Sequence, residues 1–143
     1  MTFPDRIERT LELAHPPARV WAALTTAEGL AAWFGNTAVI DLRPGGAARM
    51  TWADGSAVDM RVERVEEPTV FAFTWPLQEL AEDEAARTRV EFTLEPTGEG
   101  TRLRVVETGF GQLPAEHHGK AYDSHVEGWT NELGELVAHL DAA

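Results

Sequence analysis

The last segment of the sequence carries the side chains best suited to chemistry. Between residues 118 and 140, one stripe of residues recurs at the three- or four-residue spacing of a helix face. Its second half is aliphatic, with Leu133, Leu136 and Leu140, whereas its first half consists of rings with polar atoms, namely His118, Tyr122, His125 and Trp129. Such rings form apolar walls that still offer hydrogen bonds, as ligand pockets commonly do. The stripe predicts a helix that lines a cavity, and the alternative is that Tyr122 and Trp129 are ordinary core.

His125 is the titratable group of greatest interest in this stripe. An unperturbed histidine titrates at about pH 6.5, so it can act as a general acid or base at neutral pH. Tyr122 and Glu107 are the other candidates for acid–base catalysis. The alternative for His125 is a position in water at the rim, or a single hydrogen bond inside the core.

Neither a metal site nor another cofactor is predicted. His117 and His118 are adjacent, and adjacent helical residues point about 100° apart, so they cannot share one site with His125. The sequence has no cysteine and no H-E-x-x-H motif. It also lacks a G-x-S-x-G nucleophile motif and a phosphate-binding loop.

Two short helices and a first strand are predicted near the start of the chain. Residues 6–13 alternate between polar and apolar, which indicates a strand. Pro17 suits the first position of a helix that ends at Leu24. Thr26 would cap a second short helix, with Leu30, Trp33 and Phe34 on its buried face.

Six further strands with tight turns are predicted before the last helix. Asp54-Gly55 is a strong hairpin signal, and the acidic stretch Gln78–Ala85 is read as a solvated loop or a short helical excursion. The predicted strands cover residues 37–42, 47–52, 57–65, 69–75, 88–96 and 101–108. Their alternation places Trp52, Phe71, Phe73, Trp75 and Phe92 on one face of the sheet, either in the core or lining a cavity.

This order of elements predicts an α+β fold. Consecutive strands with short loops form an antiparallel meander, and a final helix of about 20 residues, roughly 30 Å long, can cover its buried face. A twisted sheet of seven strands must curl, and around one helix it closes poorly at one end. A cavity is the expected result.

Composition narrows the class of protein. The 143 residues suit one domain, 1–143, which needs no disulfide. A formal charge of −12 and scattered basic residues argue against nucleic acid or anionic membranes as partners. No apolar run has the length of a membrane span or signal peptide, so we expect a cytoplasmic protein, either a monomer or a homodimer.

Several stretches, in this order, resemble a known superfamily. They are ERTLELAHPPARVWAALTTAEGLAAWF, RPGGAARMTWADG, FTW, GTRLRVVETGF and HVEGWTNELGELVAHL. Together they resemble the START-like (SRPBCC) helix-grip superfamily, and within it the branch named after the activator of the heat-shock-protein-ninety ATPase. The resemblance covers about Arg6 to Leu140. It implies a curved seven-stranded antiparallel sheet wrapped around a long C-terminal helix.

The resemblance also implies roles for particular residues. Trp33 and Phe34 match the gate region of the family, and Phe110, before the last helix, could also fringe the entrance. In this superfamily the first and last strands are neighbours, so Arg9 and Glu107 would both point inward. We expect them to form a pair, or Arg9 to hold a ligand carboxylate or phenolate. The alternative is that a bulge or strand end returns either side chain to water.

The leading prediction is a protein that binds a small hydrophobic or aromatic molecule between the sheet and the C-terminal helix. The alternative is an enzyme resembling polyketide cyclase/aromatases or hydrolases, and a further alternative is a co-chaperone-type interaction module. The eponymous co-chaperone engages its chaperone through a separate amino-terminal domain, for which this chain has no room, so a chaperone partner is not expected. The candidate ligand-binding residues are Arg9, Trp33, Phe34, Trp52, Phe71, Phe73, Trp75, Phe92, Phe110, His118, Tyr122, His125 and Trp129.

Overall fold

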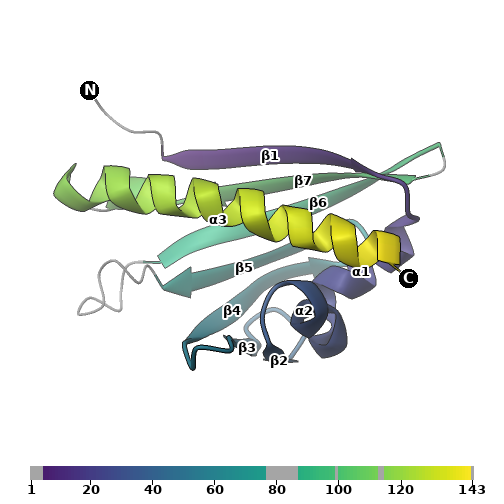
Figure 1. Cartoon of the computed structure of the whole chain (residues 1–143), viewed down its shortest axis with the longest axis horizontal. Helices are drawn as coiled ribbons and strands as arrows, with labels where there is room; N and C mark the ends of the chain where they lie inside the picture. Colours follow the sequence, from purple (N-terminus) through teal and green to yellow (C-terminus); the bar gives the residue numbers. More distant parts are fainter. Residues whose placement is uncertain (1–4, 77–86, 99, 113–114, 143) are drawn as a thin grey trace.

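Seven strands form one antiparallel sheet, and a long helix, α3 (Ala115–Ala142), crosses one face of it (Figure 1). The computed structural model describes residues 5–76, 87–98, 100–112 and 115–142, without the side chains of residues 115–118. The strand order is β1-β7-β6-β5-β4-β3-β2. The strands are β1 (Arg6–Leu13), β2 (Thr37–Ile40), β3 (Ala47–Thr51), β4 (Ala57–Glu66), β5 (Val70–Pro76), β6 (Arg87–Thr97) and β7 (Gly100–Thr108).

Two short helices connect β1 to β2. Pro17 begins α1 (Pro17–Thr25), where its missing N–H costs nothing. Thr26 Oγ1 accepts a hydrogen bond from the Gly29 N–H and so caps α2 (Ala27–Trp33), as the sequence predicts. The predicted α+β helix-grip architecture is therefore confirmed, including both short helices and the long C-terminal one.

The face of the sheet beneath α3 forms the core. On β3 to β7, the alternating residues that the sequence places inward are buried, among them Met50, Met60, Phe71, Phe92 and Leu103. From α3, the aliphatic end of the predicted stripe, Leu133, Leu136 and Leu140, is buried as well. The period-two pattern thus identifies the inner face of each of these strands correctly.

α3 is fixed to the rest of the molecule near both ends. Near its C-terminus, the Arg19 guanidinium of α1 donates to the Leu140 carbonyl at 2.6 Å, and His15 Nε2 lies 2.8 Å from an Asp141 carboxylate oxygen. Toward its N-terminus, the Tyr122 hydroxyl donates to the Arg6 carbonyl of β1 at 3.2 Å. These contacts fix the position of α3 across the face of the sheet.

Some boundaries differ from the prediction. β2 ends at Ile40 instead of Leu42, because the chain turns there: the Asp41 N–H bonds to the Ala47 carbonyl, and Gly45 takes a φ of +84°. α3 has 28 residues and so exceeds the expected length of about 20. The acidic stretch Gln78–Ala85 lies outside the described residues. Within the described ranges, none of the helices has the length and apolar character needed to cross a bilayer.

Candidate functional site

A buried carboxylate on β7 organises the site. Glu107 is 0% exposed, and four side chains contact its two oxygens. Trp75 Nε1 donates to it at 2.8 Å, Trp129 Nε1 at 2.8 Å, and the Thr88 hydroxyl at 2.5 Å. His125 Nδ1 lies 2.9 Å from Oε2. Glu107 is thereby satisfied by donors from β5, β6 and α3, and it ties the sheet to the helix.

This environment keeps Glu107 ionised. Burial acts to raise its pKa, but the hydrogen bond and charge of His125, together with bonds from Thr88 and Trp75, outweigh burial and hold the pKa below its ordinary value. An ionised carboxylate can only accept hydrogen bonds, so His125 Nδ1 must carry the proton in this contact. Nε2 is then the ring nitrogen at which the imidazole would gain or lose a proton.

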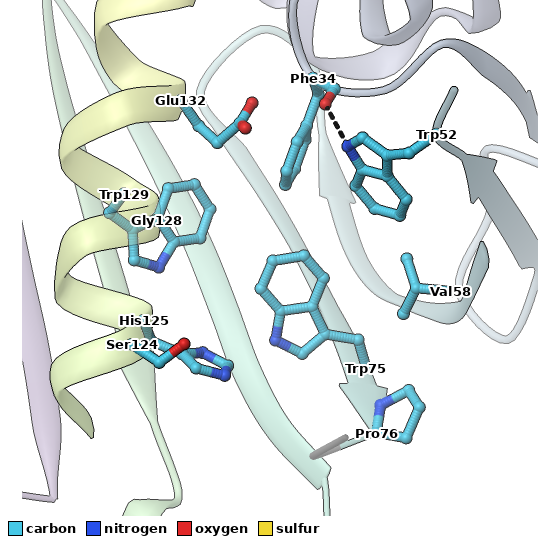
Figure 2. Close-up of a pocket in the computed structure, with 10 residues that line it drawn as sticks. All are labelled: Phe34, Trp52, Val58, Trp75, Pro76, Ser124, His125, Gly128, Trp129 and Glu132. Atoms are coloured by element: carbon cyan, nitrogen blue, oxygen red, sulfur yellow. Dashed lines mark hydrogen bonds between the residues drawn. The ribbon is translucent and has the colours of Figure 1, made fainter. Parts of the chain in front are cut away.

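A pocket lies beside this carboxylate, between α3 and the sheet (Figure 2). Its volume is about 210 Å³. Its lining consists of Phe34, Trp52, Val58, Trp75, Pro76, Ser124, His125, Gly128, Trp129 and Glu132. Three of these rings, those of Trp75, His125 and Trp129, are the ones that hydrogen-bond Glu107. Glu107 therefore fixes the orientation of the pocket wall without lining the pocket itself.

The aromatic side chains of the wall pack against one another. Phe34 follows α2, and its ring lies 6.3 Å from that of Trp52, 5.8 Å from that of Trp75 and 5.9 Å from that of Trp129. Trp52 Nε1 donates to the Phe34 carbonyl at 3.0 Å, which joins the end of α2 to the residue after β3 (Figure 2). These contacts give the pocket a rigid apolar surface, because each ring is held by neighbours and by a hydrogen bond to its N–H or backbone.

Glu132 is the second carboxyl group at the site. It follows His125 by seven residues, or two helical turns, so both lie on the same face of α3. Its Oε2 atom is buried and has no hydrogen-bond partner among the described residues. Burial, followed by the negative charge of Glu135, raises the pKa of Glu132 to about 7.

The pocket brings together part of the predicted set of ligand-binding residues. The residues from that set that line it are Phe34, Trp52, Trp75, His125 and Trp129. Trp33, Phe71, Phe73, Phe92 and Phe110 are buried in the core and do not line it. Tyr122 lies against the Phe110 ring and bonds to β1, away from the pocket. The side chain of His118 lies outside the described residues.

The expected Arg9–Glu107 pair is not formed. The two strands are neighbours and Glu107 does point inward, as predicted, but it is opposite Ile7 while Arg9 is opposite Val105. The Arg9 guanidinium is only half-buried and donates to the Glu8 carbonyl at 2.9 Å. His125 takes the place predicted for the arginine, because α3 brings its imidazole directly over the carboxylate.

Sequence reasoning did not identify several lining residues, namely Val58, Pro76, Ser124, Gly128 and Glu132. Glu132 had a detectable signal: its seven-residue distance from His125 places both on one face of the helix. In the part of the chain that the structure describes, no cluster of three or more His, Asp or Glu residues is arranged to bind a metal ion.

Comparison with known proteins identifies the family. The family described as "Activator of Hsp90 ATPase homolog 1-like protein" matches residues 14–141. The chain belongs to this family. The resemblance seen in the sequence is therefore confirmed, and the match supports a START-like domain of the ligand-binding type. The comparison with curated proteins gave no significant match.

Solved structures share the whole fold. Protein MLL2253 from Mesorhizobium loti is 28% identical and has a TM-score of 0.84, with 96% of this chain and 98% of that chain covered. Ms6760 from Mycobacterium smegmatis is 25% identical, with a TM-score of 0.72 and coverage of 97% and 92%. DynU16, a protein in the dynemicin biosynthetic locus, is 25% identical with a TM-score of 0.78; 96% of this chain aligns with 48% of that one.

Proposed function

We propose that this protein binds a small molecule with an aromatic or apolar body in the pocket between α3 and the sheet. The observation that carries the proposal is the pocket wall itself, in which four aromatic rings and a few polar atoms surround an open volume. Rings held by a buried carboxylate lose little further freedom when a ligand enters, and this favours binding.

The membership of the family and the likeness to DynU16 agree with a ligand-binding role. A role as a surface interaction module receives less support, because such a module needs an exposed apolar patch. Among the described residues, Val39 is the single large hydrophobic side chain that is exposed. A volume of about 210 Å³ favours a compact ligand, such as a one-ring aromatic molecule, over a long lipid chain.

Two glycines of α3 allow a matched test. A Cβ added at Gly128 or at Gly134 would meet nothing within 4 Å, but only Gly128 lines the pocket. Gly128→Leu should fill the pocket and reduce affinity for 2-phenylethanol at least tenfold, as measured by NMR titration. Gly134→Leu should leave the affinity unchanged, and both variants should be stabilised because leucine is the better helix former.

Native mass spectrometry of freshly purified protein complements this test by detecting a co-purifying small molecule. The proposal is supported if such a molecule is retained by the wild type and by Gly134→Leu but lost from Gly128→Leu. Equal binding of 2-phenylethanol to all three proteins would show that binding occurs elsewhere, and the proposal would then be wrong.

A second candidate is acid–base catalysis on a molecule held in the same pocket. It is favoured by the contact between ionised Glu107 and His125 Nδ1, which fixes the imidazole and assigns proton exchange to Nε2. A panel of aromatic esters and poly-β-ketone substrates would test it. His125→Gln should lower kcat/KM by about a hundredfold or more for a substrate that is turned over; an equal rate in that variant would exclude His125 as the catalytic group.

A further inference from the structure

One polar atom of the pocket lining has no hydrogen-bond partner in the described part of the chain. Among the described residues, Glu132 Oε2 and Arg19 Nε are the two buried side-chain polar atoms without a hydrogen bond. Arg19 lies at the far end of α3, where its guanidinium binds the Leu140 carbonyl. Only Glu132 belongs to the pocket lining, and Figure 2 shows its carboxyl group reaching from α3 toward Phe34. A buried acceptor without a donor is costly, so a ligand that supplies the donor gains affinity.

We propose that the preferred ligand is a cationic amine with an aromatic or apolar body, whose ammonium group pairs with the Glu132 carboxylate. This inference rests on the proposed function, because it names the class of molecule that enters the same pocket.

The composition of the wall favours a cation over an anion. Of the ten described lining residues none is Lys or Arg, so this lining offers no permanent positive charge to a carboxylate or phosphate. The ring faces of Phe34, Trp52, Trp75 and Trp129 attract a cation through their quadrupoles. The formal charge of −12 also concentrates cations near the protein.

The other charged groups around Glu132 also favour a cationic ligand. Glu135, on the next turn of α3, adds negative charge, and the elements across the pocket contribute Phe34, Trp52, Val58, Trp75 and Pro76, which do not titrate. His125 is the remaining titratable group of the wall, and the ionised Glu107 beside it offsets a positive charge on its ring. The raised pKa of Glu132, about 7, is what an acid without a cationic partner shows.

The effect of charge can be separated from that of shape with three probe molecules that share a phenyl group and differ in charge. They are 2-phenylethylamine, 2-phenylethanol and 3-phenylpropionate. At pH 8 the Glu132 carboxyl group is mostly ionised. The amine should then bind about tenfold or more tightly than the alcohol, and the carboxylate should bind most weakly. Isothermal titration calorimetry or NMR titration on the whole protein gives the three constants.

Glu132→Gln removes the charge with almost no change in shape, and Glu135→Gln removes the same charge from an exposed position on the same helix. We expect the preference for the amine over the alcohol to fall to about one in Glu132→Gln and to persist in Glu135→Gln. Unchanged affinity for the alcohol in both variants shows that the pocket is intact.

Two results overturn the inference while leaving the proposed function in place. One is equal binding of amine and alcohol to the wild type, and the other is a preference for the amine that survives in Glu132→Gln. If none of the three probes binds the wild-type protein, both the inference and the proposed function are wrong.

Discussion

Two carboxyl groups, one beside the pocket and one lining it, have opposite environments. Glu107 is buried with four donors around it, and its pKa is lowered. Glu132 lines the pocket, one of its oxygens has no hydrogen-bond partner among the described residues, and its pKa is raised to about 7. Burial acts to raise the pKa of both, so the difference comes from their partners. One carboxylate is a structural anchor, and we propose that the other pairs with a ligand.

The comparison assigns the two carboxyl groups different roles: Glu107 holds the pocket wall in place, and Glu132 is the proposed contact for the ligand. Glu107 binds the polar edges of Trp75, His125 and Trp129, so the remaining faces of these rings can form the wall. Glu132 lines the pocket and, in our proposal, pairs with the ligand. Pairs of titratable groups with divergent pKa values often mark a functional site.

The largest effect is expected at the anchor. Glu107→Gln should reduce the free energy of unfolding at pH 7 by about 3 kcal/mol or more, because it removes a buried charge that four hydrogen-bond donors stabilise. Since the folded-state pKa of Glu107 is lowered, this stabilisation is present above the unfolded-state pKa and disappears as the pH falls through the folded-state value. Urea unfolding at several pH values measures the loss. The exposed Glu95→Gln serves as the control, and equal losses in the two variants would contradict the anchor role.

Trp129 lines the pocket and also donates to Glu107. Trp129→Phe should cost about 1–3 kcal/mol of unfolding free energy, because one donor to buried Glu107 is lost, and it should also weaken binding of 2-phenylethanol. In a Glu107→Gln background the same substitution should cost less, and urea unfolding of all four proteins measures the coupling. Additive losses would show that the indole stabilises the fold only through its packing.

The pocket carboxyl group should show the opposite dependence on pH. The folded-state pKa of Glu132 is raised, so its contribution to stability is present below the ordinary value of 4.5 and is lost as the pH rises through about 7. Glu132→Gln should match the wild type at pH 5 and exceed it by about 1 kcal/mol at pH 8, a figure reduced from the full shift because the group is partly solvated. Thermal and urea unfolding at both pH values test this. A variant less stable than the wild type at pH 8 would indicate that Glu132 has a stabilising partner.

The smallest change in unfolding free energy is expected at Arg9, which the sequence predicts as the partner of Glu107. Arg9→Met should change the unfolding free energy by less than about 1 kcal/mol, because its guanidinium is half-buried and contacts a backbone carbonyl instead of Glu107. Urea unfolding at pH 7 is sufficient. A loss above about 3 kcal/mol would mean that the arginine contributes to a buried pair after all.

The fold could be predicted because its signals are local. Alternation in the strands, Pro17, the Thr26 cap and the Asp54-Gly55 turn each depend on neighbours in sequence. The site depends on how α3 lies across the sheet, and parity alone could not distinguish Arg9 from His125 as the partner of Glu107. Nor could it distinguish Trp75, which lines the pocket, from Phe73, two residues earlier on the same face, which is core.

The most direct test of a ligand pocket uses the five tryptophans as reporters. In a 15N-labelled sample titrated with 2-phenylethanol, the indole N–H signals of Trp52, Trp75 and Trp129 should shift with one common affinity. The signal of Trp21, which packs on Phe71 outside the pocket, should stay in place. No shift in the three pocket signals at saturating probe, or an equal shift at Trp21, would contradict the account.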